Sequence, residues 1–194
     1  MSPIISHLKE VVSTYYPLSE KAWQAFERCF HIREVTKGEV LYPLAKVPTS
    51  FAFIHKGLMR AYVVDEEGNE FNKNFFAEGR FPGCMTALLK SEPSLMAIEA
   101  LEESEIVEIN FAKFRQALFT TPELMAFHIH YLESHWLLEK EPKEIGYLQF
   151  EAKQRYLEFL QKYKAILPRL AQFHIASYLG ITPTQLSRIK KDLK

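Results

Sequence analysis

The chain has 194 residues, of which 47% are hydrophobic, so it can bury a core as one large domain or two small ones. It has no apolar run of about 18 residues that would span a bilayer and no start typical of a secretory signal, so we expect a cytoplasmic protein. The 24 basic and 24 acidic residues balance, but from Phe150 onward nine lysine and arginine residues face only three acidic ones. This asymmetry predicts a basic C-terminal part whose partner is a polyanion.

The first thirty residues predict two helices, and a β-rich block follows them. Ser19 is typical of a helix N-cap, and aromatic residues then recur on one helical face. From His31 to about Ile109, short runs of β-branched and aromatic residues alternate with glycine-containing turns, which indicates an antiparallel sandwich or barrel. Within this block we expect a hairpin whose tip contains Gly68.

A short helix is predicted from Asn110 to about Phe119, and a longer one begins at Pro122. Apolar residues recur every seven positions along the longer helix and make a broad seam. Such a seam can dock on its own domain or on a partner chain, and we favour the partner chain of a homodimer. The expected seam residues are Leu124, Phe127, Tyr131 and Leu138.

Pro142 and Gly146 interrupt the helical pattern and predict a hinge near Glu141 to Gly146. Another amphipathic helix is expected after this hinge. We therefore expect three parts, namely a β domain in residues 1–120, a dimerisation helix with its hinge in 121–145, and a C-terminal domain in 146–194.

Two short helical patterns separated by a glycine end the chain. Gly180 stands where a helix needs a left-handed C-terminal residue. Thr182 is a good N-cap, Pro183 suits the first helical position, and Gln185 completes an S/T-x-x-E/Q capping box. The apolar positions of the second helix, which we expect to face the core, are Leu186, Ile189 and Leu193.

The opposite face of this last helix carries side chains that suit double-stranded DNA. Arg188 can bond guanine, Gln185 can bond adenine, and lysines and hydroxyls can bind phosphates. The alternative is a plain helical hairpin with a solvated lysine-rich face. The charge asymmetry and the capping signals favour DNA. The expected DNA-binding residues are Thr182, Thr184, Gln185, Ser187, Arg188, Lys190 and Lys191.

The stretch IASYLGITPTQLSRIK resembles the helix-turn-helix of Crp/Fnr transcription regulators, and IHKGLMRAY, DEEGNE and FFAEGR match the family in the same order. The resemblance implies an α+β fold: an antiparallel, jelly-roll-like β-roll with flanking helices, similar to a cyclic nucleotide-binding domain, then a long dimerisation helix and a helix-turn-helix domain. It also implies a homodimeric regulator that binds a near-palindromic site, with RNA polymerase as a further candidate partner. By the same resemblance Arg188 reads a base. Thr184 replaces the glutamate that is usual in the family, and we expect no β-hairpin wing after the last helix. We therefore expect a DNA half-site that differs in sequence from the family's usual one.

The family's cyclic-nucleotide pocket uses a carboxylate for the ribose and an arginine for the phosphate. Here Cys84 follows Gly83 at the carboxylate position, and Pro93 and Ser94 stand where the arginine pair is expected. An anionic phosphate would then be unpaired in an apolar roll, so we expect no response to cyclic AMP. The apolar residues nearby form either a packed core, which we favour, or a pocket for an unknown small-molecule effector. They are Phe75, Phe81, Met85, Leu88, Leu89, Met96, Phe127 and Tyr131.

We expect no catalytic residues, no cofactor and no metal site. Cys29 and Cys84 lie far apart and are expected to be buried thiols. His128 and His135 share a helical face and could sense pH or metal at a dimer seam, although histidines satisfied by neighbours are commoner. A cupin-type enzyme would need an HxH pair on a strand, but HIH at 128–130 lies in a helical pattern. The remaining alternative is an effector-binding or protein-docking module without sequence-specific DNA binding.

Overall fold

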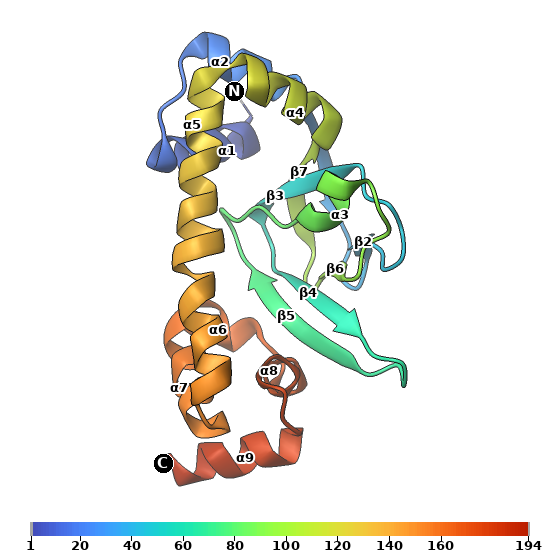
Figure 1. Ribbon diagram of the computed structural model, residues 1–194, viewed down its shortest axis with the longest axis vertical. Coiled ribbons are helices and arrows are strands. Elements are labelled where there is room, and N and C mark those ends of the chain that lie inside the picture. Colours follow the sequence, from blue (N-terminus) through green and yellow to red (C-terminus); the bar gives the residue numbers. More distant parts are fainter. Residues whose placement is uncertain (1, 194) are drawn as a thin grey trace.

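Two antiparallel sheets form the β-roll in the computed structural model, which describes residues 2–193 (Figure 1). The strand order is β1-β7-β3 in one sheet and β2-β6-β4-β5 in the other. Apolar side chains from both sheets, such as Ile54 and Ile98, meet between them and are fully buried. The strands are β1 Phe30–Val35, β2 Val40–Tyr42, β3 Ser50–Lys56, β4 Met59–Val64, β5 Glu70–Phe76, β6 Ala97–Ala100 and β7 Ser104–Asn110.

The helices lie before, within and after the roll, so the predicted α+β fold is confirmed. Those flanking or inserted in the roll are α1 Pro3–Tyr15, α2 Glu20–Glu27, α3 Met85–Lys90 and α4 Phe111–Thr120. The long helix consists of α5 Pro122–Leu132, the π-helical segment η1 Glu133–Leu138 and α6 Lys140–Gln149. The C-terminal part consists of α7 Ala152–Lys162, the 3-10 segment η2 Lys164–Arg169, α8 Gln172–Leu179 and α9 Pro183–Asp192.

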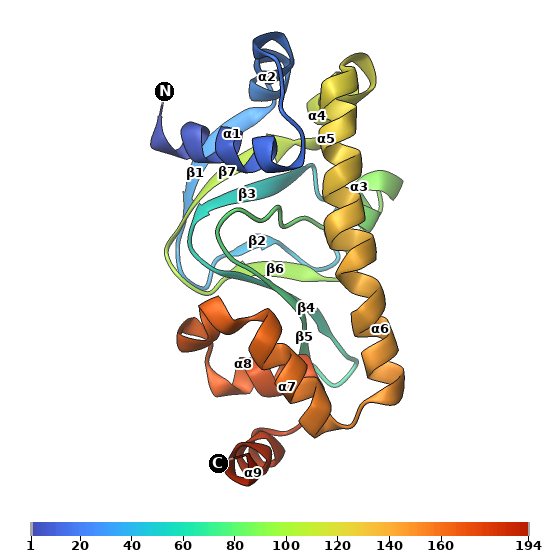
Figure 2. The same cartoon turned by 90° about the vertical axis from the view of Figure 1, so that its left-hand side faces the viewer.

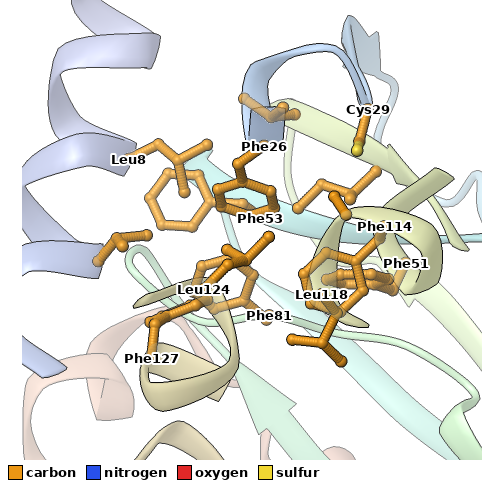
Figure 3. Close-up of a cluster of buried hydrophobic side chains, with 14 of the residues drawn as sticks. Leu8, Phe26, Cys29, Phe51, Phe53, Phe81, Phe114, Leu118, Leu124 and Phe127 are labelled. Atoms are coloured by element: carbon orange, nitrogen blue, oxygen red, sulfur yellow. The ribbon is translucent and has the colours of Figure 1, made fainter. Parts of the chain in front are cut away.

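An aromatic core joins the N-terminal helices to the three-stranded sheet and to α5. Figure 3 shows Phe26, Phe53 and Phe127 pointing into this core from α2, β3 and α5. The first two helices therefore cover the roll, and Ser19 caps α2 as predicted, because its side chain accepts a hydrogen bond from the Ala22 N–H. The hairpin of β4 and β5 is also confirmed.

The predicted hinge near Glu141 to Gly146 is wrong, because these residues are helical in α6, which continues the rod formed by α5 and η1 (Figure 1). Regular α-helix is interrupted earlier in this rod, by the π-helical segment η1 and by Glu139 at the start of α6. Pro142 lies in the first turn of α6, where a helix does not need its backbone N–H. Gly146 serves close packing, because a Cβ there would lie 3.1 Å from Phe150 Cδ2 and 3.2 Å from Glu158 Oε2. The rod ends at Gln149, past the boundary expected at 145.

The loop after β5 holds the roll against the long helix. Its backbone extends the free edge of β3, since Ile54 donates to the Arg80 carbonyl and Ala52 to the Pro82 carbonyl. This pairing directs Arg80 toward Glu139 of the long helix, with two hydrogen bonds of 3.1 and 3.2 Å. The C-terminal helices α7 and α8 then pack beneath β4 and β5 (Figure 2).

Candidate nucleic-acid interface

The last two helices form the predicted helix-turn-helix. Gly180 has a φ of 66°, the left-handed conformation that suits glycine, and ends α8. The capping box starts α9, with Gln185 N–H donating to Thr182 Oγ1 at 3.1 Å and Thr182 N–H donating to Gln185 Oε1 at 2.9 Å. These local bonds fix the angle at which α9 leaves the turn.

Helix α9 is attached to the molecule by one buried side chain. Leu186 is 1% exposed, and Ile189 is partly buried against the same cluster. Leu193 is 39% exposed, so the expectation that it faces the core is wrong; it follows the end of α9 at Asp192, where the helical spacing no longer holds. Figure 1 shows α9 at the end of the molecule remote from the N-terminus.

Most of the expected DNA-binding residues share the outer surface of α9. Arg188 and Lys191 are exposed and form no ion pair within residues 2–193. The amide oxygen of Gln185 is engaged in the capping box, and Lys190 is partly buried, with its Nζ donating to Gln172 Oε1 at 2.8 Å. The other expected residues are also exposed and are Thr182, Thr184 and Ser187.

The first helix of the pair, α8, docks on the edge strand of the roll through polar contacts that sequence reasoning missed. Ser177 Oγ accepts from the Asn72 backbone N–H at 2.9 Å and donates to the Glu70 carbonyl at 2.7 Å. Asn72 Nδ2 donates to the His174 carbonyl at 3.0 Å. The asparagines of NEFNKNFF interrupt the aromatic pattern of a strand, and they were the feature of the sequence that could have indicated polar contacts at this strand.

Two side chains of this junction are buried although they can carry charge. Arg60 is 6% exposed and donates to Glu99 Oε2 at 2.9 and 2.6 Å and to Asn72 Oδ1 at 3.1 Å. Burial and the nearby Arg60 lower the pKa of His174 to about 4, so its imidazole is neutral at physiological pH. The junction is therefore held by a paired polar network within an aromatic cluster.

Inside the roll, the structure places Cys84 at the start of α3, where the family resemblance locates the ribose carboxylate. The thiol is 2% exposed and donates to the Met96 carbonyl at 3.6 Å, and burial raises its pKa. Ser94 Oγ donates to the same carbonyl at 2.6 Å. Hydrophobic side chains such as Ile54 and Ile98 pack in the same interior cluster as Cys84.

The residues expected around an effector pocket are divided among separate hydrophobic clusters. Leu89 is 60% exposed, Met96 packs against the interior cluster, and Phe75 packs below the sheet against α7 and α8. The packed-core alternative describes them better, because the other members lie in the N-terminal core. Those members are Phe81, Met85, Leu88, Phe127 and Tyr131.

The expected dimer seam also needs correction. Leu124, Phe127 and Tyr131 are 0, 3 and 7% exposed and pack on the core of their own chain, which leaves almost none of their surface for a partner. Figure 3 shows Leu124 and Phe127 in this core. Only Leu138 of the expected seam is exposed, at 74%. A different apolar face of the long helix remains uncovered, with Met125, Ile129 and Trp136 spaced four and seven residues apart.

The histidines of the long helix are satisfied by their own chain. His128 packs edge-on against Phe114, and burial together with Arg115 lowers its pKa to about 4. His135 Nε2 lies 2.7 Å from the Tyr15 hydroxyl, and its Nδ1 pairs with Glu139. Within residues 2–193 no group of three His, Cys, Asp or Glu residues could hold a metal ion. In the same residues no helix is long and apolar enough to cross a membrane.

Comparison with known proteins places the β-roll in a family. A model of the cyclic nucleotide-binding domain matches residues 32–121. The cAMP-activated global transcriptional regulator CRP of Salmonella typhimurium is 23% identical over 109 residues, which are 56% of this chain and 52% of that protein. The chain thus aligns with about half the length of this curated relative.

Solved structures share the fold over most of the chain. CLP of Xanthomonas campestris, described as a c-di-GMP responsive global regulator, has a TM-score of 0.71 at 17% identity and covers 90% of this chain and 91% of its own. FixK2 of Bradyrhizobium japonicum has a TM-score of 0.70 at 18% identity and covers 84% of each chain. The chain therefore contains a region similar to the cyclic nucleotide-binding domain, and its fold is similar to that of the regulators CLP and FixK2.

Proposed function

We propose that the protein is a cytoplasmic, homodimeric, DNA-binding transcription regulator. The exposed cationic face of α9 is the observation that carries this proposal. Its known relatives and structural neighbours include transcription regulators, and the surplus of positive charge lies in the part of the chain that holds α9. The family resemblance alone supplies RNA polymerase as a further candidate partner.

On α9, the proposed DNA-recognition helix, different side chains are suited to bases and to phosphates. Arg188 can bond guanine in the major groove, while Lys191 can bind a phosphate without reading sequence. The amide oxygen of Gln185 accepts the capping hydrogen bond from the Thr182 N–H, so only its amide NH₂ is available to a base. A bidentate hydrogen bond to adenine would require this capping bond to break. Discrimination therefore falls mainly on Arg188.

The uncovered apolar face of the long helix, formed by Met125, Ile129 and Trp136, is the proposed dimer interface. A second copy of the chain is its occupant, because the four- and seven-residue spacing suits a parallel helix pair. Such a dimer would present two α9 helices to successive major grooves about 34 Å apart. Ile129→Asp should convert the dimer to monomer in sedimentation, whereas Phe119→Asp, exposed on α4, should not; a wild-type monomer at micromolar concentration would exclude the dimer.

We also propose that cyclic AMP is not the effector. Cys84 and Pro93 stand where the family resemblance expects the carboxylate and the arginine, so a bound cyclic AMP would lack those two polar partners. Calorimetry should show no saturable binding of cyclic AMP at micromolar concentration, and saturable binding would overturn this part of the proposal.

Selection of bound duplexes from a random pool tests the main proposal. The wild-type chain should enrich a near-palindromic site, Arg188→Ala should lose preference at one base in each half-site, and Lys191→Ala should weaken all duplexes alike. The loss at Arg188 should be about 1–3 kcal/mol for the preferred base. If no sequence is enriched by the wild-type chain, the protein-docking alternative is favoured instead.

A further inference from the structure

A cleft opens where the long helix, the C-terminal helices and the roll meet, and we call it the junction cleft. It consists of two adjoining cavities of about 220 and 460 Å³. Glu139, Pro142 and Lys162 line both cavities, so the two are parts of one space. The aromatic rings of Tyr147 and Tyr178 line the smaller cavity. Figure 2 shows α6, α7 and α8 gathered around this region below β4 and β5.

Cations from three separate parts of the chain line the junction cleft. Arg80 comes from the loop after β5, Lys143 from the long helix, and Lys162 from α7. Arg80 and Lys162 share one carboxylate, since Arg80 bonds both oxygens of Glu139 and Lys162 Nζ lies 3.6 Å from one of them. The nearby Glu78 is already held by Arg169 at 3.0 Å.

Lys143 is a largely buried cation that forms no ion pair with any of residues 2–193. Its Nζ donates to the Lys73 carbonyl at 2.7 Å and lies 4.2 Å from the centre of the Tyr178 ring. Lys73 is the unpaired residue where the register of β4 and β5 shifts, so its carbonyl is free to accept. Within residues 2–193 no carboxylate lies within 4.0 Å of Lys143.

Burial and the repulsion of neighbouring lysines act on this cluster together. They lower the pKa of Lys143 to about 7, with Lys162 and Lys73 as the repelling charges. The pKa of Lys162 is lowered as well, chiefly by burial. Positive charges held this close are stabilised by an anion that enters between them.

We propose that the junction cleft binds a small multivalent oxyanion, such as a phosphate ester or a polycarboxylate, between Arg80, Lys143 and Lys162. The lysines supply charge, and the planar guanidinium of Arg80 supplies directional hydrogen bonds. The tyrosine rings of the smaller cavity can contact the apolar part of such a molecule. A bound anion would tie together the roll, the long helix and the C-terminal domain. This binding requires no DNA, so it can be tested independently of the proposed function.

Calorimetry of the full chain with pyrophosphate and with citrate tests the proposal. We expect one site per chain for at least one of the two anions, with an affinity that falls as ionic strength rises. Binding of pyrophosphate alone would indicate a phosphate ester, and binding of citrate alone a polycarboxylate. Absence of saturable heat up to about 10 mM of either anion would overturn the proposal.

Two lysine variants locate the site, and a third serves as the matched control. Lys143→Met and Lys162→Met should each weaken binding by about tenfold or more, because each removes a charge that faces the anion. Lys153→Met, exposed on the same helix as Lys162, should bind as the wild type does. Equal affinities of all three variants would place the anion elsewhere and refute the junction cleft. The Lys162 variant keeps the test valid if Lys143→Met does not fold.

Proton uptake gives a readout that a purely structural role of Lys143 would not produce. The titratable and charged groups around Lys143 come from four elements. They are Lys73 of β5, Arg155, Glu158 and Lys162 of α7, Tyr178 of α8, and Glu139 and Tyr147 of the long helix. An anion that raises the pKa of Lys143 from about 7 takes up protons when it binds near pH 8. Titrations in buffers of different ionisation enthalpy should show this uptake in the wild type and less of it in Lys143→Met; no uptake in the wild type would contradict binding beside Lys143.

Discussion

The interior of the roll and the junction of α8 with the roll are stabilised by different kinds of interaction. Between the two sheets the packed side chains are hydrophobic and fully or almost fully buried. At the junction, Arg60, Asn72 and His174 are buried beside the aromatic side chains that α7 and α8 contribute. An apolar interior depends on shape alone, whereas a buried polar network depends on every partner being present and in the right protonation state. The junction is therefore the part of the molecule that we expect to respond to pH and to charged ligands.

The largest expected effect tests the apolar half of this comparison. Ile98→Ala removes a fully buried side chain from β6 between the two sheets and should destabilise the chain by about 2–5 kcal/mol, because it leaves a cavity that packed neighbours cannot fill. The shift of the urea midpoint, followed by the fluorescence of buried Trp23, measures this loss.

Ile32→Ala is the matched control, because Ile32 lies on β1 and is 50% exposed. It should change stability by less than about 0.5 kcal/mol. Similar losses for the two variants would show that the roll interior is not the stabilising core.

The next effect concerns pH at the junction. His174 has a folded pKa of about 4, below its value of 6.5 in an unfolded chain, so the unfolded state binds the proton more readily. The stability that this neutral histidine provides is present above pH 6.5 and is lost as pH falls toward 4. His128 titrates over the same range and adds to the loss. A pKa difference of this size corresponds to about 3 kcal/mol in the free energy of unfolding, and the partial solvation of His174 makes its contribution smaller.

Urea midpoints measured from pH 7.5 to 4 isolate the contribution of His174. His174→Gln should make the decline shallower than in the wild type, because this residue no longer takes up a proton on unfolding. His31→Gln, exposed on β1, should leave the decline unchanged. A wild-type slope that His174→Gln does not alter would mean that the junction tolerates a charged imidazole.

Local signals predicted local structure, and they failed where the outcome depended on a distant part of the chain. Gly180 and Thr182 define the turn between α8 and α9 with bonds to near neighbours, so the sequence pattern was sufficient there. Pro142 and Gly146 look like helix breakers in sequence. Whether Pro142 breaks the helix depends on the π-helical segment η1 that precedes α6. Whether Gly146 does so depends on how closely Phe150 and α7 pack against it.

The assignment of the apolar seam to a partner chain failed for the same reason. A seven-residue repeat shows that Leu124, Phe127 and Tyr131 share a face, but it does not show whether the roll or a second chain covers that face. In the structure the roll covers it. The docking of α8 on β5 through Ser177 was likewise invisible, because it joins residues more than a hundred positions apart.

The smallest expected effect separates α9 from the junction. Thr182→Ala removes the side chain that caps α9 and should destabilise that helix by about 1 kcal/mol. Helix α9 is anchored chiefly by Leu186, whereas α8 is held by Ser177, Asn72 and an aromatic cluster. The loss should therefore stay in α9, where amide hydrogen exchange should accelerate about fivefold while that of α8 does not change.

Thr184→Ala controls for the loss of a threonine on the same helix, because its side chain is exposed and takes no part in the capping box. Its exchange rates should stay close to those of the wild type. If Thr182→Ala accelerated exchange equally in α8 and α9, the two helices would open as one unit. The contacts between α8 and the roll would then be coupled to the proposed DNA-binding surface, and a ligand bound in the junction cleft could act on α9 directly.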